Sequence, residues 1–181
     1  PTGGGFGIWL VFGKAKVGTF NLINCSFIDL HSLTTGGAFE SGNATTDIMK
    51  LNIDNCTFIG NQSPCGGALS IQSALEAQIR NSNFVSNQAD QVGGAIYIYS
   101  KGVKNENLHL PSCIITKCKF ELNKDKSNNG HAIYFKYGLE SSTHFEISDC
   151  NFTDNNVDGS EGFTISSDAP YFNITNVKIN F

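Results

Sequence analysis

The chain has 181 residues, 40% of them hydrophobic and 15% charged, so it is long enough to form one domain with its own core. Its net charge is −4, and Arg80 is the single arginine among 12 basic residues. Binding along a nucleic-acid backbone needs a basic surface, so we expect no nucleic-acid partner. No apolar run approaches the roughly 20 residues that span a bilayer, so we expect no membrane span in this segment.

The sequence repeats the motif Cys-x-Phe-x-x-Asn at intervals of 26 to 36 residues. Ser82 replaces the Cys in one copy, Leu30 replaces the Asn in another, and Val177 marks a weak last copy. The residues at equivalent positions are Cys25, Cys56, Cys118 and Cys150, then Phe27, Phe58, Phe84, Phe120 and Phe152, then Asn61, Asn87, Asn123 and Asn155. A period of this length is typical of a solenoid, in which each repeat is one coil.

A glycine turn opens the other half of each repeat. Gly-Gly-Ala and an apolar residue begin at Gly36, Gly66 and Gly93, with degenerate copies at Gly5, Gly130 and Gly162. Apolar and polar residues alternate after this turn and again before the Cys, as in half-buried strands. The sequence therefore predicts an all-β protein: a right-handed parallel β-helix of about six coils with three short strands per coil.

This register assigns a structural task to each residue of the motif. Phe rings should stack from coil to coil in the core, and the double glycine should permit positive φ and close backbone approach. Asn amides should hydrogen-bond along the helix axis, both after the Phe and in a second column before the Cys, at Asn24, Asn55, Asn81, Lys117, Asp149 and Asn176. The Cys column is expected to hold buried free thiols, with bridges between Cys25 and Cys56 or between Cys118 and Cys150 as the alternative.

The chain is expected to be a single β-helix segment over residues 1–181, with an inserted loop at 101–112. Because a solenoid needs polar caps and neither end carries one, we expect the segment to be an excerpt of a longer solenoid. Six Asn-x-Ser/Thr sequons occur. The three that lie in a loop or alternate outward are the candidates for N-glycosylation: Asn43, Asn151 and Asn173.

The pairing of Phe-x-x-Asn with Gly-Gly-Ala followed by Ile, Leu or Val resembles the polymorphic membrane protein family, surface adhesins first described in chlamydiae. Four copies of the first motif carry it, at Phe58, Phe84, Phe120 and Phe152, and so do Gly66–Leu69 and Gly93–Ile96. The resemblance implies a β-helix exposed outside the cell or at its surface, acting in adhesion or as a coat component. Its partners would be a host-cell or matrix protein or glycan, or copies of itself.

An enzyme is the main rival, because many β-helix proteins cleave acidic polysaccharides. A lyase or hydrolase needs paired acids, or calcium with a basic proton acceptor. Only Asp54 beside Arg80 approaches such a group, and a surface ion pair is the better explanation of it. Asp125 is expected in a loop, and His131 is expected to have no acid beside it. With no metal-ligand spacing, we expect no metal, no cofactor and no enzymatic activity.

Outward aromatic residues on the strands after the glycine turn form the candidate contact face: Trp9, Tyr97, Tyr99 and Tyr134. Tyr97 and Tyr134 should be direct neighbours on successive coils. The alternative is that the insertion at 101–112 covers them. A third hypothesis is a filament or appendage whose coils stack end to end, because an open solenoid end presents unpaired backbone groups.

Overall fold

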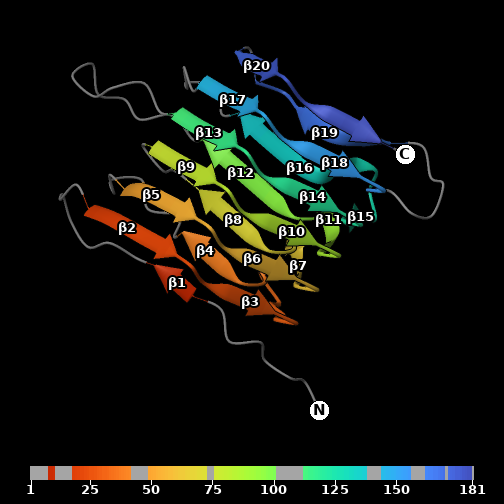
Figure 1. Ribbon diagram of the computed structural model, residues 1–181. Coiled ribbons are helices and arrows are strands. Elements are labelled where there is room, and N and C mark those ends of the chain that lie inside the picture. The colour runs from red at the N-terminus through yellow and green to blue at the C-terminus, as the bar shows by residue number, and fades with distance from the viewer. Residues whose placement is uncertain are drawn as a thin grey trace.

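The computed structural model describes residues 8–10, 18–41, 49–72, 76–100, 112–137, 144–155, 162–169 and 171–180. Within these ranges the chain contains strands, turns and loops and no helix. The strands stack from β1 and β2 at one end to β19 and β20 at the other (Figure 1). Neighbouring strands pair in parallel, so the fold is the predicted parallel β-helix.

Three six-stranded sheets run along the helix, one for each strand of the predicted coil. The glycine-turn sheet contains β1 (Ile8–Leu10), β4 (Phe39–Ser41), β8 (Leu69–Gln72), β12 (Ile96–Ser100), β16 (Asn129–Tyr137) and β19 (Phe163–Ser167). The pre-Cys sheet contains β2 (Gly18–Ile23), β5 (Met49–Asp54), β9 (Glu76–Arg80), β13 (Ser112–Thr116), β17 (His144–Ser148) and β20 (Phe172–Thr175). The Phe sheet contains β3 (Ser26–Ile28), β6 (Thr57–Ile59), β10 (Asn83–Val85), β14 (Lys119–Glu121), β18 (Asn151–Thr153) and β21 (Lys178–Asn180).

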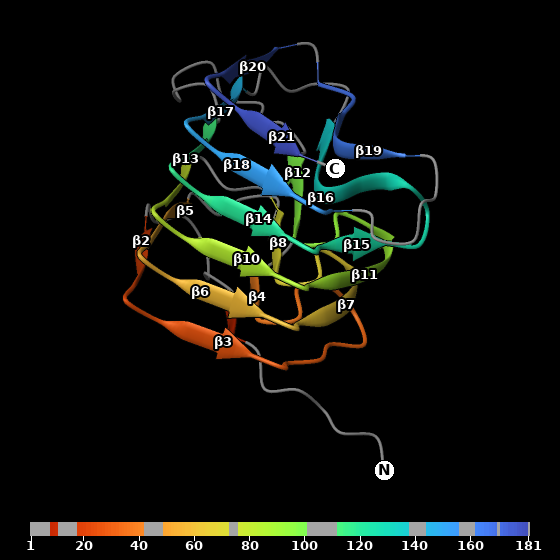
Figure 2. The same cartoon turned by 45° about the vertical axis from the view of Figure 1, so that its right-hand side comes forward.

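A fourth, three-stranded sheet was not predicted. This corner sheet contains β7 (Gln62–Cys65), β11 (Gln88–Val92) and β15 (Lys124–Asp125) and lies beside the Phe sheet (Figure 2). Its strands follow the Asn of the motif and show no alternation of large apolar residues, because only a single small side chain such as Ser63 or Ala89 points inward. Two further boundaries differ from expectation. Ser112 is the first residue of β13, while 101–111 lies outside the described residues, and Asp125 ends β15.

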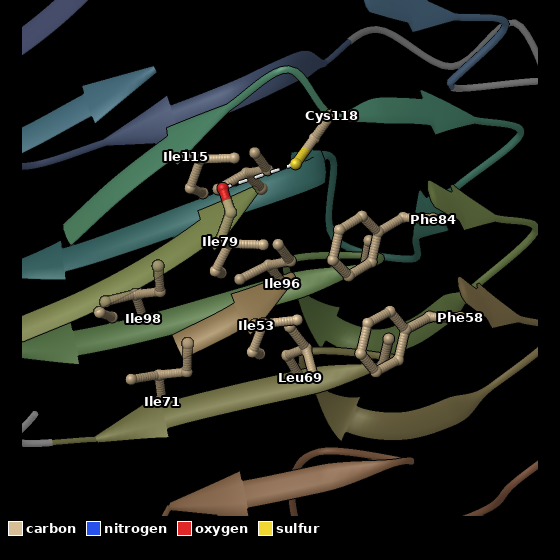
Figure 3. Packing of buried hydrophobic residues seen from close by; sticks show 14 of the residues in the cluster. Ile53, Phe58, Leu69, Ile71, Ile79, Phe84, Ile96, Ile98, Ile115 and Cys118 are labelled. Atoms are coloured by element: carbon tan, nitrogen blue, oxygen red, sulfur yellow. Dashed lines mark hydrogen bonds between the residues drawn. The ribbon is translucent and has the colours of Figure 1, made fainter. Parts of the chain in front are cut away.

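The core consists of stacked side chains in register from coil to coil. Phe27, Phe58, Phe84, Phe120 and Phe152 form a parallel column with ring centroids 4.7 to 5.1 Å apart. That separation matches the distance between neighbouring strands, because each strand contributes one ring. Aliphatic side chains such as Ile53, Ile79 and Ile115 fill the rest of the interior (Figure 3). Complete burial of each large side chain contributes about 1.5–3 kcal/mol. The fully buried part of the core runs from Leu22 to Phe152, while Ile174 and Ile179 in the last coil are exposed.

In the turns that carry two glycines, the two have different structural tasks. The first, as in Gly66, has φ near +68°, a left-handed conformation that costs other residues energy. The second lies against the backbone of the next coil: a Cβ on Gly67 would be 2.1 Å from the carbonyl oxygen of Gly94. The first glycine therefore turns the chain, and the second lets successive coils approach.

Candidate contact face

The Asn of the motif forms a buried ladder that satisfies its own hydrogen bonds. The side-chain Nδ2 of Asn87 donates to Oδ1 of Asn123 at 3.0 Å and to the carbonyl oxygen of Phe58 at 3.0 Å. In return its Oδ1 accepts from the backbone N–H of Asn61 at 3.0 Å and from its Nδ2 at 2.9 Å. Asn123 repeats this pattern toward Asn155. These amides are therefore scaffold, and Asn61, although part of a sequon, is completely buried.

All six cysteines have free thiols. In the Cys column each thiol points back to the backbone of its own coil, as Cys56 does in donating to the carbonyl of Asp54 at 3.3 Å. Ser82 reproduces this contact with the carbonyl of Arg80 at 2.7 Å, which explains why serine fits the column. Between the last two members, the N–H of Cys118 donates to Sγ of Cys150 at 3.4 Å.

The second Asn column is defined by backbone conformation. All six of its residues have positive φ, between 51° and 57°. Side-chain bonds connect only some of them, as where Nδ2 of Asn55 donates to Asn24 at 2.7 Å. Asn81 instead bonds Asp54 at 2.8 Å. Amide stacking therefore explains the column in part, and the tolerance of Asn and Asp for left-handed backbone explains the rest.

The outward row of the glycine-turn sheet brings two of the predicted aromatics together. Tyr97 and Tyr134 are paired in register, and their rings stack with centroids 6.1 Å apart and planes 7° apart. Trp9 lies in the same row but is separated from them, because Glu40 and Ser70 occupy the two intervening strands. The four predicted residues therefore do not form one continuous patch.

The two stacked tyrosines differ in their access to solvent. Tyr97 is 9% exposed although it lies outside the coil, and this burial raises its pKa. Tyr134 is half-buried, and desolvation followed by the nearby Asp168 carboxylate raises its pKa as well. Both phenol groups are therefore neutral hydrogen-bonding groups at physiological pH. Of the two stacked rings, Tyr134 is therefore the more exposed to solvent, and Tyr97 packs against it.

A second outward row flanks this pair. The Lys136 ammonium lies over the Tyr99 ring, 5.6 Å from its centroid, a cation–π geometry. The backbone N–H of Tyr137, next to Lys136 in β16, donates to Oδ1 of Asp168 at 2.6 Å, which fixes that exposed carboxylate just after β19 at the edge of the face. We use the term tyrosine face for Tyr97, Tyr99, Tyr134, Lys136 and Asp168.

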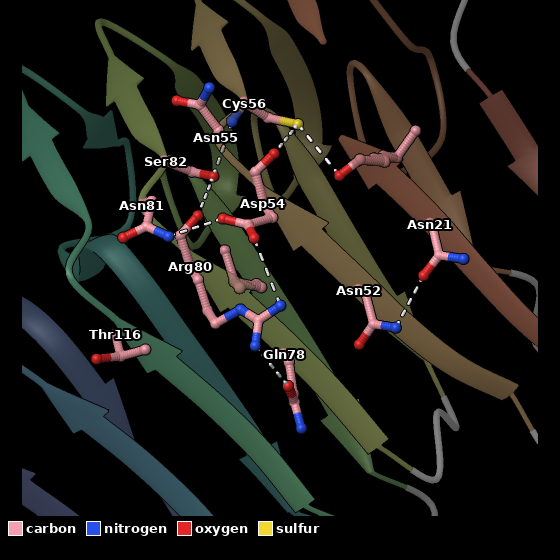
Figure 4. Close-up of polar contacts among 12 residues, drawn as sticks. Asn21, Asn52, Asp54, Asn55, Cys56, Gln78, Arg80, Asn81, Ser82 and Thr116 are labelled. Carbon is pink, nitrogen blue, oxygen red and sulfur yellow. Dashed lines mark hydrogen bonds and ion pairs between the residues drawn. The ribbon is translucent and has the colours of Figure 1, made fainter. Parts of the chain in front are cut away.

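The Asp54–Arg80 pair lies on the outer side of the pre-Cys sheet (Figure 4). Arg80 contacts the Asp54 carboxylate at 3.4 Å and the Gln78 amide oxygen at 3.3 Å, while Asn81 donates to the other carboxylate oxygen. The Arg80 side chain is 43% exposed and the Asp54 side chain is 31% exposed. Each oxygen of Asp54 is thus bonded to a neighbouring side chain, the arrangement of a surface polar network.

One buried contact between an acid and a histidine differs from the sequence-based expectation. Asp125 is buried in β15, not in a loop, and its Oδ1 lies 2.9 Å from Nδ1 of His131, which was expected to have no acid beside it. His131 occupies the position of the second glycine, and its ring fills the space next to Gly162. The other carboxylate oxygen of Asp125 accepts bonds from Ser127 and Asn129. The histidine at a turn-glycine position was the sequence signal for this contact. Its partner Asp125 was not identified, because the sequence was interpreted as a loop at that position.

The predicted glycosylation sites fall into two groups. Asn151 and Asn173 are exposed on β18 and β20, on the outer sides of their sheets. Asn43 lies outside the described residues.

A metal-binding cluster and a membrane-spanning helix are both absent from the described ranges. No group of three or more His, Cys, Asp or Glu side chains is placed to hold a metal ion there. No helix in that part of the chain has the length and apolar character to cross a membrane.

A repeat-family model matches one coil of the chain. Residues 55–72 match the family model of the Chlamydia polymorphic membrane protein repeat. This segment runs from the end of β5 through β6 and β7 to β8, and so covers most of one coil with both halves of the motif. Neither the search of curated proteins nor that of solved structures found a match. The chain therefore carries a polymorphic membrane protein-like repeat.

Proposed function

We propose that the chain is a non-enzymatic β-helix segment of a protein exposed at the cell surface, and that it acts in adhesion through the tyrosine face. The repeat match supports the surface location, because the matching family is one of membrane proteins. The observation that carries the adhesive role is that the residues of the repeat motif have structural tasks. The Cys, Phe, Asn and Gly of the repeat are buried in the core or at corners, so recognition must use residues that the repeat leaves free.

The tyrosine face is the best candidate among those residues. It combines a rigid stacked ring pair with polar edges from Lys136 and Asp168, on a sheet whose backbone is fixed by neighbouring coils. Aromatic rings that carry a polar tip give large contact area at low entropic cost, which is typical of recognition surfaces. A partner would be a protein or glycan of a host cell or matrix.

Cell attachment by the purified chain tests this proposal. Tyr134→Ala should reduce attachment at least about tenfold if the ring is an interface anchor, while Tyr134→Phe should retain most of it. Glu121→Ala is the matched control, because Glu121 is outward and exposed on the Phe sheet. Equal attachment by the wild type, Tyr134→Ala and Glu121→Ala would reject the tyrosine face as the adhesive surface.

A further inference from the structure

The stack of Tyr97 and Tyr134 ends at a serine. In the outward row, Tyr97 pairs with Tyr134, and Tyr134 pairs with Ser166 of β19. Since β16 lies between β12 and β19, one face of the Tyr134 ring is covered by Tyr97 and the opposite face points toward Ser166. Among the described residues no other ring stacks on Tyr134.

Among the described residues, the register leaves one strand spacing beside the Tyr134 ring, above Ser166. Strands in a sheet are about 4.8 Å apart, and in this protein that spacing accommodates one aromatic ring per coil in the Phe column. Ser166 extends only a hydroxyl beyond its Cβ, so it cannot cover the ring above it. The partial exposure of Tyr134, against 9% for Tyr97, agrees with an uncovered outer face.

The groups around this space have the chemistry of a sugar site. The C–H bonds on one side of a pyranose ring carry partial positive charge and are attracted to the negative face of an aromatic ring. Ser166 and the Tyr134 hydroxyl can donate or accept, and the exposed Asp168 carboxylate can accept hydrogen bonds from sugar hydroxyls.

The negative charge of Asp168 favours neutral sugars over acidic ones. Asp168 is held at the edge of this space by the N–H of Tyr137, so it would repel a uronate or sulfate group. Lys136, the nearby cation, lies over Tyr99 on the side away from β19. We propose that the outer face of Tyr134, above Ser166 and beside Asp168, binds a neutral pyranose ring of a glycan. This assignment rests on the proposed adhesive function and names its ligand class.

Saturation-transfer NMR with defined tetrasaccharides tests the assignment. The probes are neutral tetramers of glucose, mannose and N-acetylglucosamine, and a tetramer of galacturonate as the anionic comparison. At least one neutral tetramer should receive saturation from the wild type, and the galacturonate tetramer should receive less. Tyr134→Ala should remove the signal. Absence of contact with all three neutral tetramers, or stronger contact with the galacturonate, would overturn the assignment.

Filling the space gives a second, independent variant. Ser166→Tyr should extend the aromatic stack and leave the thermal unfolding temperature unchanged or raised. It should reduce sugar contact at least about tenfold, because the new ring occupies the site. Thr153→Tyr adds the same ring on the outer side of β18 and should keep full contact. If Ser166→Tyr binds sugar as well as Thr153→Tyr, the site is not above Ser166 and the assignment fails.

The two proposals fail in different ways. If Tyr134→Ala loses cell attachment but no neutral tetramer contacts the wild type, the tyrosine face remains adhesive and the sugar assignment is overturned. If Tyr134→Ala loses neither attachment nor sugar contact, both are overturned.

Discussion

Lys117 is the one residue of the second Asn column that is neither Asn nor Asp. It has φ of +54°, whereas Asn and Asp occupy the other five positions at similar angles. A residue with a Cβ in this conformation costs roughly 1–2 kcal/mol, and Asn and Asp adopt it more readily because their short polar side chains bond locally. The Lys117 side chain is exposed, so its replacement removes little packing.

Lys117→Asn should therefore stabilise the protein. We expect the free energy of unfolding in urea to rise by about 1 kcal/mol, because the left-handed strain is relieved. The control is Lys119→Asn, an exposed lysine two residues later in the strand β14, where the backbone is extended. An equal change in both variants would show that the backbone angle is not the cause.

At the scale of one structural element, the buried Asn ladder joins coils that are also joined by backbone pairing. Each interior amide takes part in bonds to both neighbouring coils. Leu30 shows what happens without the amide: its N–H donates to Oδ1 of Asn61 at 3.1 Å, and the ladder begins one coil later. The Asn ladder is thus a cooperative unit, because each member satisfies groups on the next.

Asn87→Ala should be strongly destabilising, since it leaves the N–H and amide of Asn61 and the carbonyl of Phe58 without these partners. Buried unsatisfied groups cost about 1–3 kcal/mol each, so we expect a loss of about 3 kcal/mol or more in urea unfolding. Asn52→Ala, in the extended strand β5, removes only an exposed bond to Asn21 and should cost less than about 1 kcal/mol because solvent replaces that bond. Similar losses at both positions would contradict the role assigned to burial.

At the scale of the whole molecule, the buried thiols connect stability to pH. Burial raises the pKa of Cys113 and of Cys56, and for Cys118 the bond with Cys150 acts together with burial. In the unfolded chain these thiols ionise near their ordinary pKa of 9.0. Above that pH the unfolded chain releases protons that the folded chain retains, so stability is unaffected below pH 9 and is lost as the pH rises further.

Thermal unfolding from pH 7 to pH 11 checks this pH dependence. The unfolding free energy should fall above pH 9 by about 1.4 kcal/mol per pH unit for each strongly shifted thiol. Cys113→Ala should make the fall less steep, since Cys113 is completely buried in β13 and alanine occupies the same register position in β9. Cys25→Ala removes a half-exposed thiol and serves as the control. An unchanged slope in Cys113→Ala would refute the linkage.

The sequence by itself determined the coil register. Phe20, Leu51 and Ala77 and their successors lie inward as the alternation indicates, because a slip of one residue would turn every side chain of a strand to the other face. The Phe column and the glycine turns follow from the same repeat, and so does the adjacency of Tyr97 and Tyr134.

The tertiary structure decided what the repeat does not encode. The corner sheet has no apolar periodicity, and the burial of Tyr97 depends on what surrounds the outer side of the coil. The contact of His131 with Asp125 depends on how the chain turns between β15 and β16. Such contacts arise where residues break the period, and their partners are set by packing in three dimensions. The repeat therefore predicts the scaffold, while the partial exposure of Tyr134 and the burial of the stacked Tyr97 are properties of the folded molecule.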